Sequence, residues 1–198
     1  VILSNLHNAV EEFDLVFPLT FGAKSSSMIG GVLSTNAGGS NVLKYGNTRT
    51  LCMGLEVVLP DGRVLDLMSE LHKDNTGYDL KDLIVGAEGT LGIITAAVLK
   101  LSPRPVACTT AMIATSSLDN ALKVLNILQE ETGGGVEAFE YMPKNYIETH
   151  LTKVPNSRPP FDKFYDVNIM LEIGSTIVGD SIPSVTGESM LTKSIQEI

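Results

Sequence analysis

Residues 29–39 read IGGVLSTNAGG and residues 85–95 read VGAEGTLGIIT, and these two glycine-rich stretches decide the interpretation of the fold. Glycine has no Cβ, so its backbone N–H groups can approach a ligand closely. In the first stretch, Ser34, Thr35 and Asn36 add polar groups suited to the oxygens of a diphosphate. An ordinary glycine-rich loop packed against a sheet explains the same composition equally well.

Several common nucleotide and metal sites are disfavoured. Neither stretch has the strand, GxGxxG and helix order of a Rossmann fingerprint, and residues 21–26 (FGAKSS) lack the spacing of a P-loop. His7, His72 and His150 lie in separate segments without the spacing of zinc ligands. We therefore assign no metal ligand and no catalytic residue. Asp79, Asp82 and Glu88 could act as bases, but helix capping and solvent exposure explain the two aspartates as well.

Composition narrows the class of protein. The chain has 198 residues, 43% of them hydrophobic, and a net charge of −9. No basic stripe is available to replace counterions on nucleic acid, and no apolar run approaches the roughly 20 residues that cross a bilayer. Cys52 and Cys108 are far apart, which predicts two buried thiols rather than a disulfide framework.

Local patterns predict an α+β fold with a boundary at residues 102–105 (SPRP). In residues 1–104 we expect a helix capped by Ser4, extended backbone at 15–19, a hairpin around Pro60, Asp61 and Gly62, a helix capped by Asp79 and a strand at 91–101. From Gly22 to Gly46 the composition shifts to Gly and Ser, and a stretch of this kind cannot build a core alone. In residues 105–198 we expect strands at 107–114, 136–140 and 164–173, with helices at 118–131 and 143–151.

Six blocks in unbroken order resemble the FAD-linked oxidases of the vanillyl-alcohol oxidase / p-cresol methylhydroxylase type. They are FPL at 17–19, IGG at 29–31, STNAGG at 34–39, KYG at 44–46, GLEVVLPDG at 54–62 and EGTLGIIT at 88–95. Within that superfamily, KDNTGYDLK at 73–81 is most similar to the D-2-hydroxyglutarate branch, since lactate and glycolate relatives usually carry Val-Ala in place of Asn75 and Thr76.

The resemblance implies that residues 1–104 are the second subdomain of a PCMH-type FAD-binding domain and that residues 105–198 begin an α+β cap, or substrate, domain. It implies that FAD is lined by Pro18, Gly22, Ile29, Gly30, Gly31, Thr35, Asn36, Gly38, Gly39, Gly46, Glu88, Gly89, Gly92 and Ile93. Val32 departs from the Asn that the family commonly has, which we expect to weaken flavin binding by about 1 kcal/mol.

The implied activity is oxidation of a D-2-hydroxy acid, with D-2-hydroxyglutarate favoured, to the 2-oxo acid by hydride transfer to flavin. D-lactate, glycolate or another alcohol is the alternative substrate, and a non-catalytic nucleotide-binding relative is the alternative class. The resemblance places the first FAD subdomain before Val1, and the catalytic residues and a divalent metal site, such as zinc, beyond Ile198. It also implies an electron acceptor, a homodimer, and a cytoplasmic location in bacteria or a mitochondrial one in eukaryotes.

Overall fold

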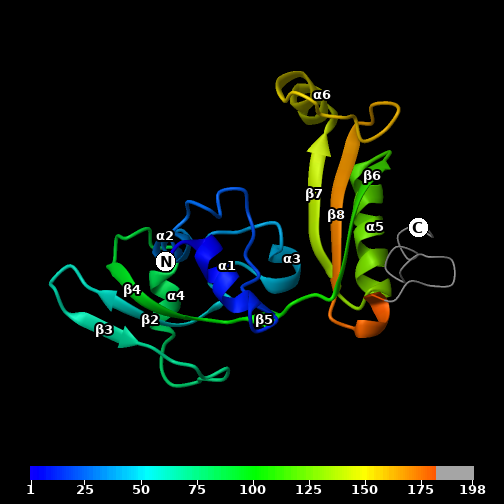
Figure 1. The fold of residues 1–198 in the computed structure, drawn as a ribbon. Coiled ribbons are helices and arrows are strands. Elements are labelled where there is room, and N and C mark those ends of the chain that lie inside the picture. Colours follow the sequence, from blue (N-terminus) through cyan, green and yellow to red (C-terminus); the bar gives the residue numbers. More distant parts are fainter. Residues whose placement is uncertain (182–198) are drawn as a thin grey trace. The chain divides into compact units, whose positions relative to one another are not determined.

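The structure is a computed structural model in which residues 1–181 are described (Figure 1). The chain divides into two compact units, Val1–Arg104 and Pro105–Ile198. Each unit combines helices with antiparallel strands, so the predicted α+β class is confirmed.

The first unit contains four short helices and five strands. The helices are α1 (Leu3–Glu11), α2 (Ile29–Ser34), α3 (Val42–Tyr45) and α4 (Leu80–Ile84), and the strands are β1 (Leu15–Val16), β2 (Cys52–Val58), β3 (Val64–Leu67), β4 (Ile93–Leu99) and β5 (Ser102–Pro103). Strands β3, β2 and β4 form an antiparallel sheet in that order, and β1 pairs with β5.

The predicted hairpin is confirmed at β2 and β3. The Leu59 N–H donates to the Arg63 carbonyl at 2.9 Å, and the Gly62 N–H donates to the Leu59 carbonyl at the same distance. Gly62 has φ +85°, a left-handed conformation that glycine adopts without strain. Turn chemistry at residues 60–62 is therefore sufficient to fix the register of the two strands.

Helix α2 separates two hydrophobic clusters of the first unit. Val32 packs with Leu3, Phe17, Leu19 and Leu51. The next residue, Leu33, packs with a second cluster formed by Cys52, Leu55, Val57, Ile84 and Val85. Because neighbouring side chains on this helix enter different clusters, its remaining face is turned outward.

Three expectations for this unit were wrong in detail. Helix α1 begins at Leu3 with Ile2 at its N-cap, so Ser4 lies inside the helix and does not cap it. Residues 29–34 form helix α2 rather than loop, because burial of Val32 and Leu33 outweighs the poor helix propensity of two glycines. Asp79 does occupy the N-cap of α4, but its side chain makes no capping hydrogen bond.

The second unit places a long helix on a three-stranded sheet. Its elements are β6 (Ala107–Thr115), α5 (Leu118–Glu131), β7 (Val136–Pro143), α6 (Lys144–Lys153), β8 (Val167–Ser175) and the 3-10 helix η1 (Val178–Ser181). Strand β8 is central and antiparallel to β6 and β7. Leu128 of α5 packs with Leu171 and Ile173 of β8, so alternate β8 residues face this helix.

The sequence located the elements of the second unit well. Helix α5 has the predicted bounds, and Ser117 caps it by accepting from the Asn120 N–H at 3.2 Å.

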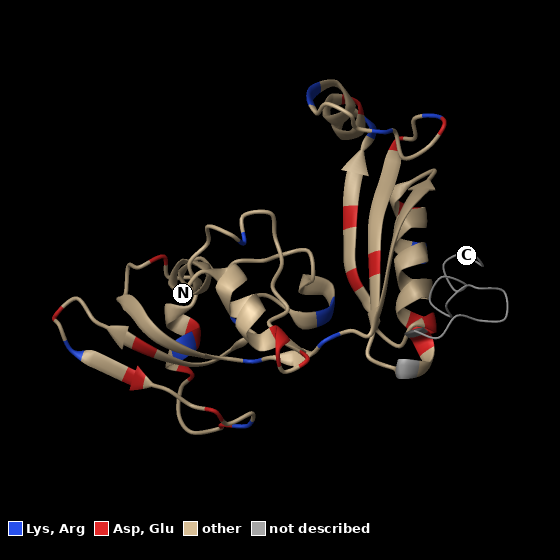
Figure 2. Cartoon of the chain, viewed as in Figure 1, with Lys and Arg blue, Asp and Glu red and all other residues tan. Residues whose placement is uncertain are grey.

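Acidic positions lie along β7 and β8 (Figure 2), at Glu137, Glu140 and Glu172. One expectation failed: Cys52 is buried as predicted, but Cys108 on β6 is exposed.

Candidate functional site

The two glycine-rich stretches meet through backbone hydrogen bonds between residues more than 50 positions apart in the sequence. The Gly86 N–H donates to the Leu33 carbonyl at 3.1 Å, and the Glu88 N–H donates to the Ser34 carbonyl at 2.9 Å. Two successive bonds of this kind fix both the spacing and the register of the segments. The C-terminal end of α2 and the turn after α4 therefore form one continuous surface.

The outward face of α2 presents small groups to this surface. Gly31 and Thr35 are exposed one turn apart, and the Thr35 hydroxyl donates to the Gly31 carbonyl at 3.0 Å. A Cβ built on Gly31 or on Gly89 would meet nothing within 4 Å. Open space over exposed backbone is the property that a closely bound dinucleotide needs.

Left-handed backbone is concentrated in the same region. Asn36 has φ +48° and Glu88 has φ +52°, while Gly86 and Gly89 have φ +88° and +78°. A non-glycine residue held there costs about 1–2 kcal/mol, so the surroundings must impose it. The Asn36 Oδ1 accepts the Arg49 N–H at 2.9 Å, so this amide oxygen holds the backbone instead of being available to a ligand.

The predicted cofactor-binding residues differ in exposure. The exposed ones are Gly22, Gly31, Thr35, Gly38, Glu88, Gly89 and Ile93; the partly buried ones are Ile29, Gly30, Asn36, Gly39 and Gly46; the buried ones are Pro18 and Gly92. Contact of any of them with FAD stays a prediction.

Some of these residues have a packing role that the sequence did not reveal. A Cβ on Gly92 would lie 2.6 Å from the Val57 side chain and 2.7 Å from the Val58 carbonyl. A Cβ on Gly39 would lie 2.4 Å from the Thr20 carbonyl. Glycine is required at both positions by close approach of neighbouring backbone.

Val32 lies in the hydrophobic core of the first unit. Its side chain is 5% exposed and belongs to the cluster around Phe17 and Leu51. A residue that faces this core has no polar contact with a surface ligand to lose. The 1 kcal/mol penalty expected for flavin binding stays a prediction.

Arg49 was missed by sequence reasoning. One terminal nitrogen of its guanidinium, Nη2, donates to the Val85 carbonyl at 2.7 Å, while its backbone N–H holds Asn36. It thus contacts both glycine-rich stretches. The only sequence signal is that Arg49 is the sole charged residue between Lys44 and Glu56.

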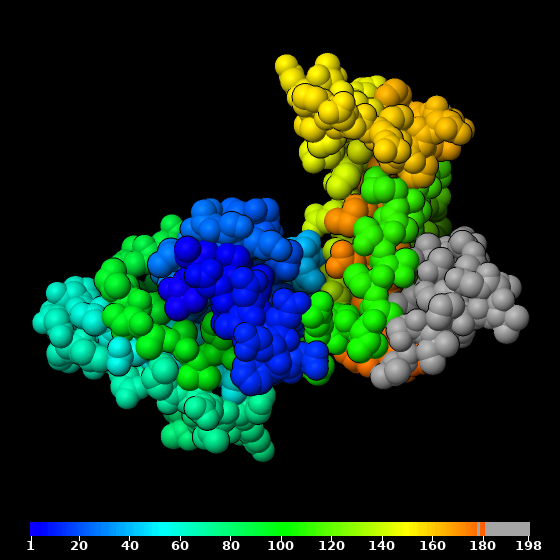
Figure 3. Space-filling model, viewed as in Figure 1, coloured from blue at the N-terminus to red at the C-terminus, as the bar shows by residue number. Residues whose placement is uncertain are grey.

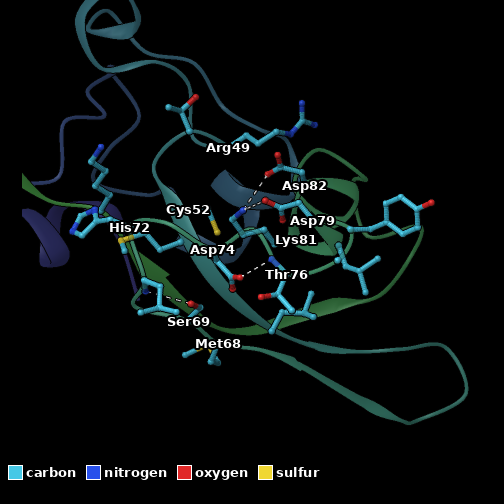
Figure 4. A pocket seen from close by; sticks show the side chains of 18 residues that line it. Arg49, Cys52, Met68, Ser69, His72, Asp74, Thr76, Asp79, Lys81 and Asp82 are labelled. Atoms are coloured by element: carbon cyan, nitrogen blue, oxygen red, sulfur yellow. Dashed lines mark hydrogen bonds and ion pairs between the residues drawn. The ribbon is translucent and has the colours of Figure 1, made fainter.

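A pocket of about 560 Å³ lies beside α4 and shares Arg49 with the glycine-rich junction (Figure 4). It contains none of the predicted cofactor residues, but Asp74, Thr76, Tyr78, Asp79 and Lys81 of the 73–81 block line it. Residues 70–80 follow the β2–β3 hairpin in the sequence and are exposed at the surface of the first unit (Figure 3). The block used to distinguish family branches is therefore the wall of a polar pocket.

In this pocket the positive charge of Lys81 is compensated by two carboxylates. Lys81 pairs with Asp79 and lies 3.8 Å from an Asp82 carboxylate oxygen. Burial lowers the pKa of Lys81, but Asp79 and Asp82 outweigh it and the net shift is upward. Burial raises the pKa of the neighbouring Cys52 thiol to about 11, which leaves it protonated and unreactive at neutral pH.

Two absences hold for residues 1–181. Within that range no three His, Cys, Asp or Glu side chains gather in a way that could hold a metal ion. In the same part of the chain, no helix combines the length and apolar character needed to cross a membrane.

Comparison with known proteins identifies the domain type. Residues 1–68 match the family model described as FAD binding domain. A mitochondrial D-2-hydroxyglutarate dehydrogenase from Danio rerio is 45% identical over 153 residues, which cover 76% of this chain and 29% of that protein. Residues 1–68 therefore carry part of an FAD binding domain. FAD is the cofactor that this domain is named for.

Two further comparisons extend the likeness. A putative mitochondrial D-lactate dehydrogenase from Schizosaccharomyces pombe is 37% identical over 172 residues, covering 87% of this chain and 32% of that protein. A solved alkyldihydroxyacetonephosphate synthase aligns with TM-score 0.67 and 22% identity, over 88% of this chain and 34% of that one, which supports the fold alone. The chain spans about a third of the length of these proteins.

Proposed function

We propose that the protein containing this chain is an FAD-dependent oxidoreductase that oxidises a D-2-hydroxy acid to the 2-oxo acid. The observation that carries the proposal is the junction of the two glycine-rich stretches through the Leu33–Gly86 and Ser34–Glu88 hydrogen bonds. Similarity to a D-2-hydroxyglutarate dehydrogenase over three quarters of the chain supports the choice of chemistry.

The residues at this junction fit FAD. Exposed glycine backbone at Gly31 and Gly89 leaves room for close approach, and the Thr35 hydroxyl is accessible beside it. The Arg49 guanidinium donates to the Val85 carbonyl at this junction, where it adds one positive charge on the same surface as the exposed Glu88 carboxylate. We propose that the predicted residues exposed at this junction hold the cofactor, while Pro18, Gly39 and Gly92 maintain the packing beneath.

When bound, FAD supplies the acceptor for the hydride that leaves C2 of the hydroxy acid. The residues of this chain bind and orient that group through rigid backbone, which reduces the motion that must be frozen during the reaction. Among residues 1–181 we assign no acid or base to the proton transfer. The chain's part in catalysis is therefore cofactor positioning.

D-2-hydroxyglutarate is the favoured substrate, because the KDNTGYDLK block resembles that branch and the Danio rerio relative carries that name. D-lactate is the second candidate, favoured by the Schizosaccharomyces pombe relative. We further propose that residues 105–198 begin the substrate domain and that the location is mitochondrial in a eukaryote, as in the relatives' names. The electron acceptor, homodimer and zinc site stay predictions.

The test uses the full-length protein, purified and freed of oxygen. D-2-hydroxyglutarate, its L enantiomer, D-lactate and glycolate are added separately while flavin absorbance is followed at about 450 nm. We expect rapid bleaching with D-2-hydroxyglutarate and formation of one 2-oxo acid per flavin. A full-length protein without flavin absorbance contradicts the proposal, and bleaching by D-lactate alone selects the second candidate.

A further inference from the structure

We propose that Arg49, supported by Thr48, is a positioning residue that holds the two glycine-rich stretches in the arrangement that binds FAD. This inference rests on the proposed function and assigns a role to residues outside the predicted site. Arg49 acts through the backbone of its neighbours rather than through the reacting atoms.

The contacts of residues 48 and 49 reach both stretches. Thr48 is fully buried, and its hydroxyl and N–H both donate to the Ala37 carbonyl, at 2.6 and 3.2 Å. The Arg49 N–H donates to Asn36 Oδ1 at 2.9 Å, which fixes the left-handed Asn36. The Arg49 Nη2 then spans 36 positions to the Val85 carbonyl at 2.7 Å.

The geometry at Gly86 depends on this guanidinium. A Cβ on Gly86 would lie 3.0 Å from Arg49 Nη2 and 3.2 Å from Asn36 Cβ, and Gly86 has φ +88°. The space that a side chain at residue 86 would need is therefore occupied by Arg49 and Asn36. The Gly86 N–H begins the pair of bonds to α2, so moving Arg49 changes the position of Gly86 and Glu88 together.

A lysine cannot reproduce this arrangement. The planar guanidinium lies beside Gly86, and its Nη2 donates to the Val85 carbonyl. Its buried Nε has no hydrogen-bond partner among the described residues. A flexible ammonium would satisfy Val85 without filling the same plane. Shape as well as charge is thus needed at residue 49.

The experiment measures FAD affinity in full-length apoprotein carrying Arg49→Ala or Arg49→Lys. The control is Arg63→Ala, which removes an exposed hairpin arginine paired with Asp61. Because Arg49→Ala loses one charge-assisted hydrogen bond, we expect it to bind FAD at least about tenfold more weakly than the wild type. Arg49→Lys should bind FAD more tightly than Arg49→Ala but more weakly than the wild type. Millimolar guanidinium chloride, compared with equal sodium chloride, should partly restore affinity in Arg49→Ala and not alter Arg63→Ala.

Two results would overturn the inference while leaving the proposed function intact. One is wild-type FAD affinity in Arg49→Ala. The other is weakened affinity that guanidinium does not restore, because that would mark general damage to the fold. A wild-type full-length protein that fails to bind FAD would instead overturn the proposed function on which this inference rests.

Discussion

The Glu88 N–H donates to the Ser34 carbonyl at 2.9 Å and joins two segments that are 54 positions apart in the sequence. Glu88 has φ +52° and Ser34 is the last residue of α2. The bond therefore fixes a strained turn against the end of a helix.

Gly31→Ala should separate fold stability from cofactor binding. Gly31 is exposed in α2 and a Cβ there meets nothing within 4 Å, so the substitution should stabilise the apoprotein by roughly 0.5–1 kcal/mol through helix propensity. The added methyl group should weaken FAD binding if this face holds the cofactor. Chemical denaturation and FAD titration measure the two effects, and unchanged FAD affinity would remove Gly31 from the site.

Gly92→Ala should destabilise the first unit. The new Cβ would lie 2.7 Å from the Val58 carbonyl, which is sheet backbone and cannot rotate away. Overpacking of this kind costs about 1–3 kcal/mol. A denaturant midpoint equal to that of the wild type would show that Gly92 does not pack as described.

Helix α5 offers a matched pair of substitutions in the second unit. Leu128 is fully buried against β8, whereas Leu122 on the same helix is 57% exposed. Leu128→Ala should cost about 2–5 kcal/mol of unfolding free energy, and Leu122→Ala should cost well under 1 kcal/mol. Equal losses in the two variants would contradict the orientation of α5 on the sheet.

His7 should make the protein less stable in acid. Burial and the positive charge of Lys24 lower the pKa of His7 below its usual 6.5, so the unfolded state binds more protons as the pH falls through that value. Unfolding free energy should decrease below about pH 6.5, and His7→Gln should flatten this dependence. Denaturation at several pH values tests it; an equally steep loss in His7→Gln would assign the dependence to other groups.

The two cysteines should react very differently. Burial raises the pKa of Cys52 to about 11, while Cys108 is exposed. Because the unfolded thiol titrates near 9, protein stability should also fall as the pH rises between about 9 and 11. Mass spectrometry after brief alkylation at neutral pH should find label on Cys108, and prompt labelling of Cys52 would contradict its burial.

Local patterns were enough to predict parts of this fold and not others. Pro60, Asp61 and Gly62 specify a turn by themselves, and the apolar stripe of residues 118–131 specifies a helix without knowledge of its partner. Helix α2 could not be predicted, because two glycines oppose it and only tertiary burial of Val32 and Leu33 overcomes them.

The site shows the same division between local and distant information. Glycine content pointed to exposed backbone at Gly31 and Gly89, but it could not distinguish these from Gly39 and Gly92, which meet neighbouring backbone. Arg49 was missed because its partner Val85 is 36 positions away and no local pattern encodes that contact.

Hydrogen exchange on the full-length apoprotein, with and without FAD, tests the central claim most directly. If residues 29–39 and 85–93 together hold the cofactor, FAD should slow amide exchange in both segments while the hairpin turn at residues 60–62 is unaffected. Bound FAD that leaves exchange unchanged in these two segments would contradict the account.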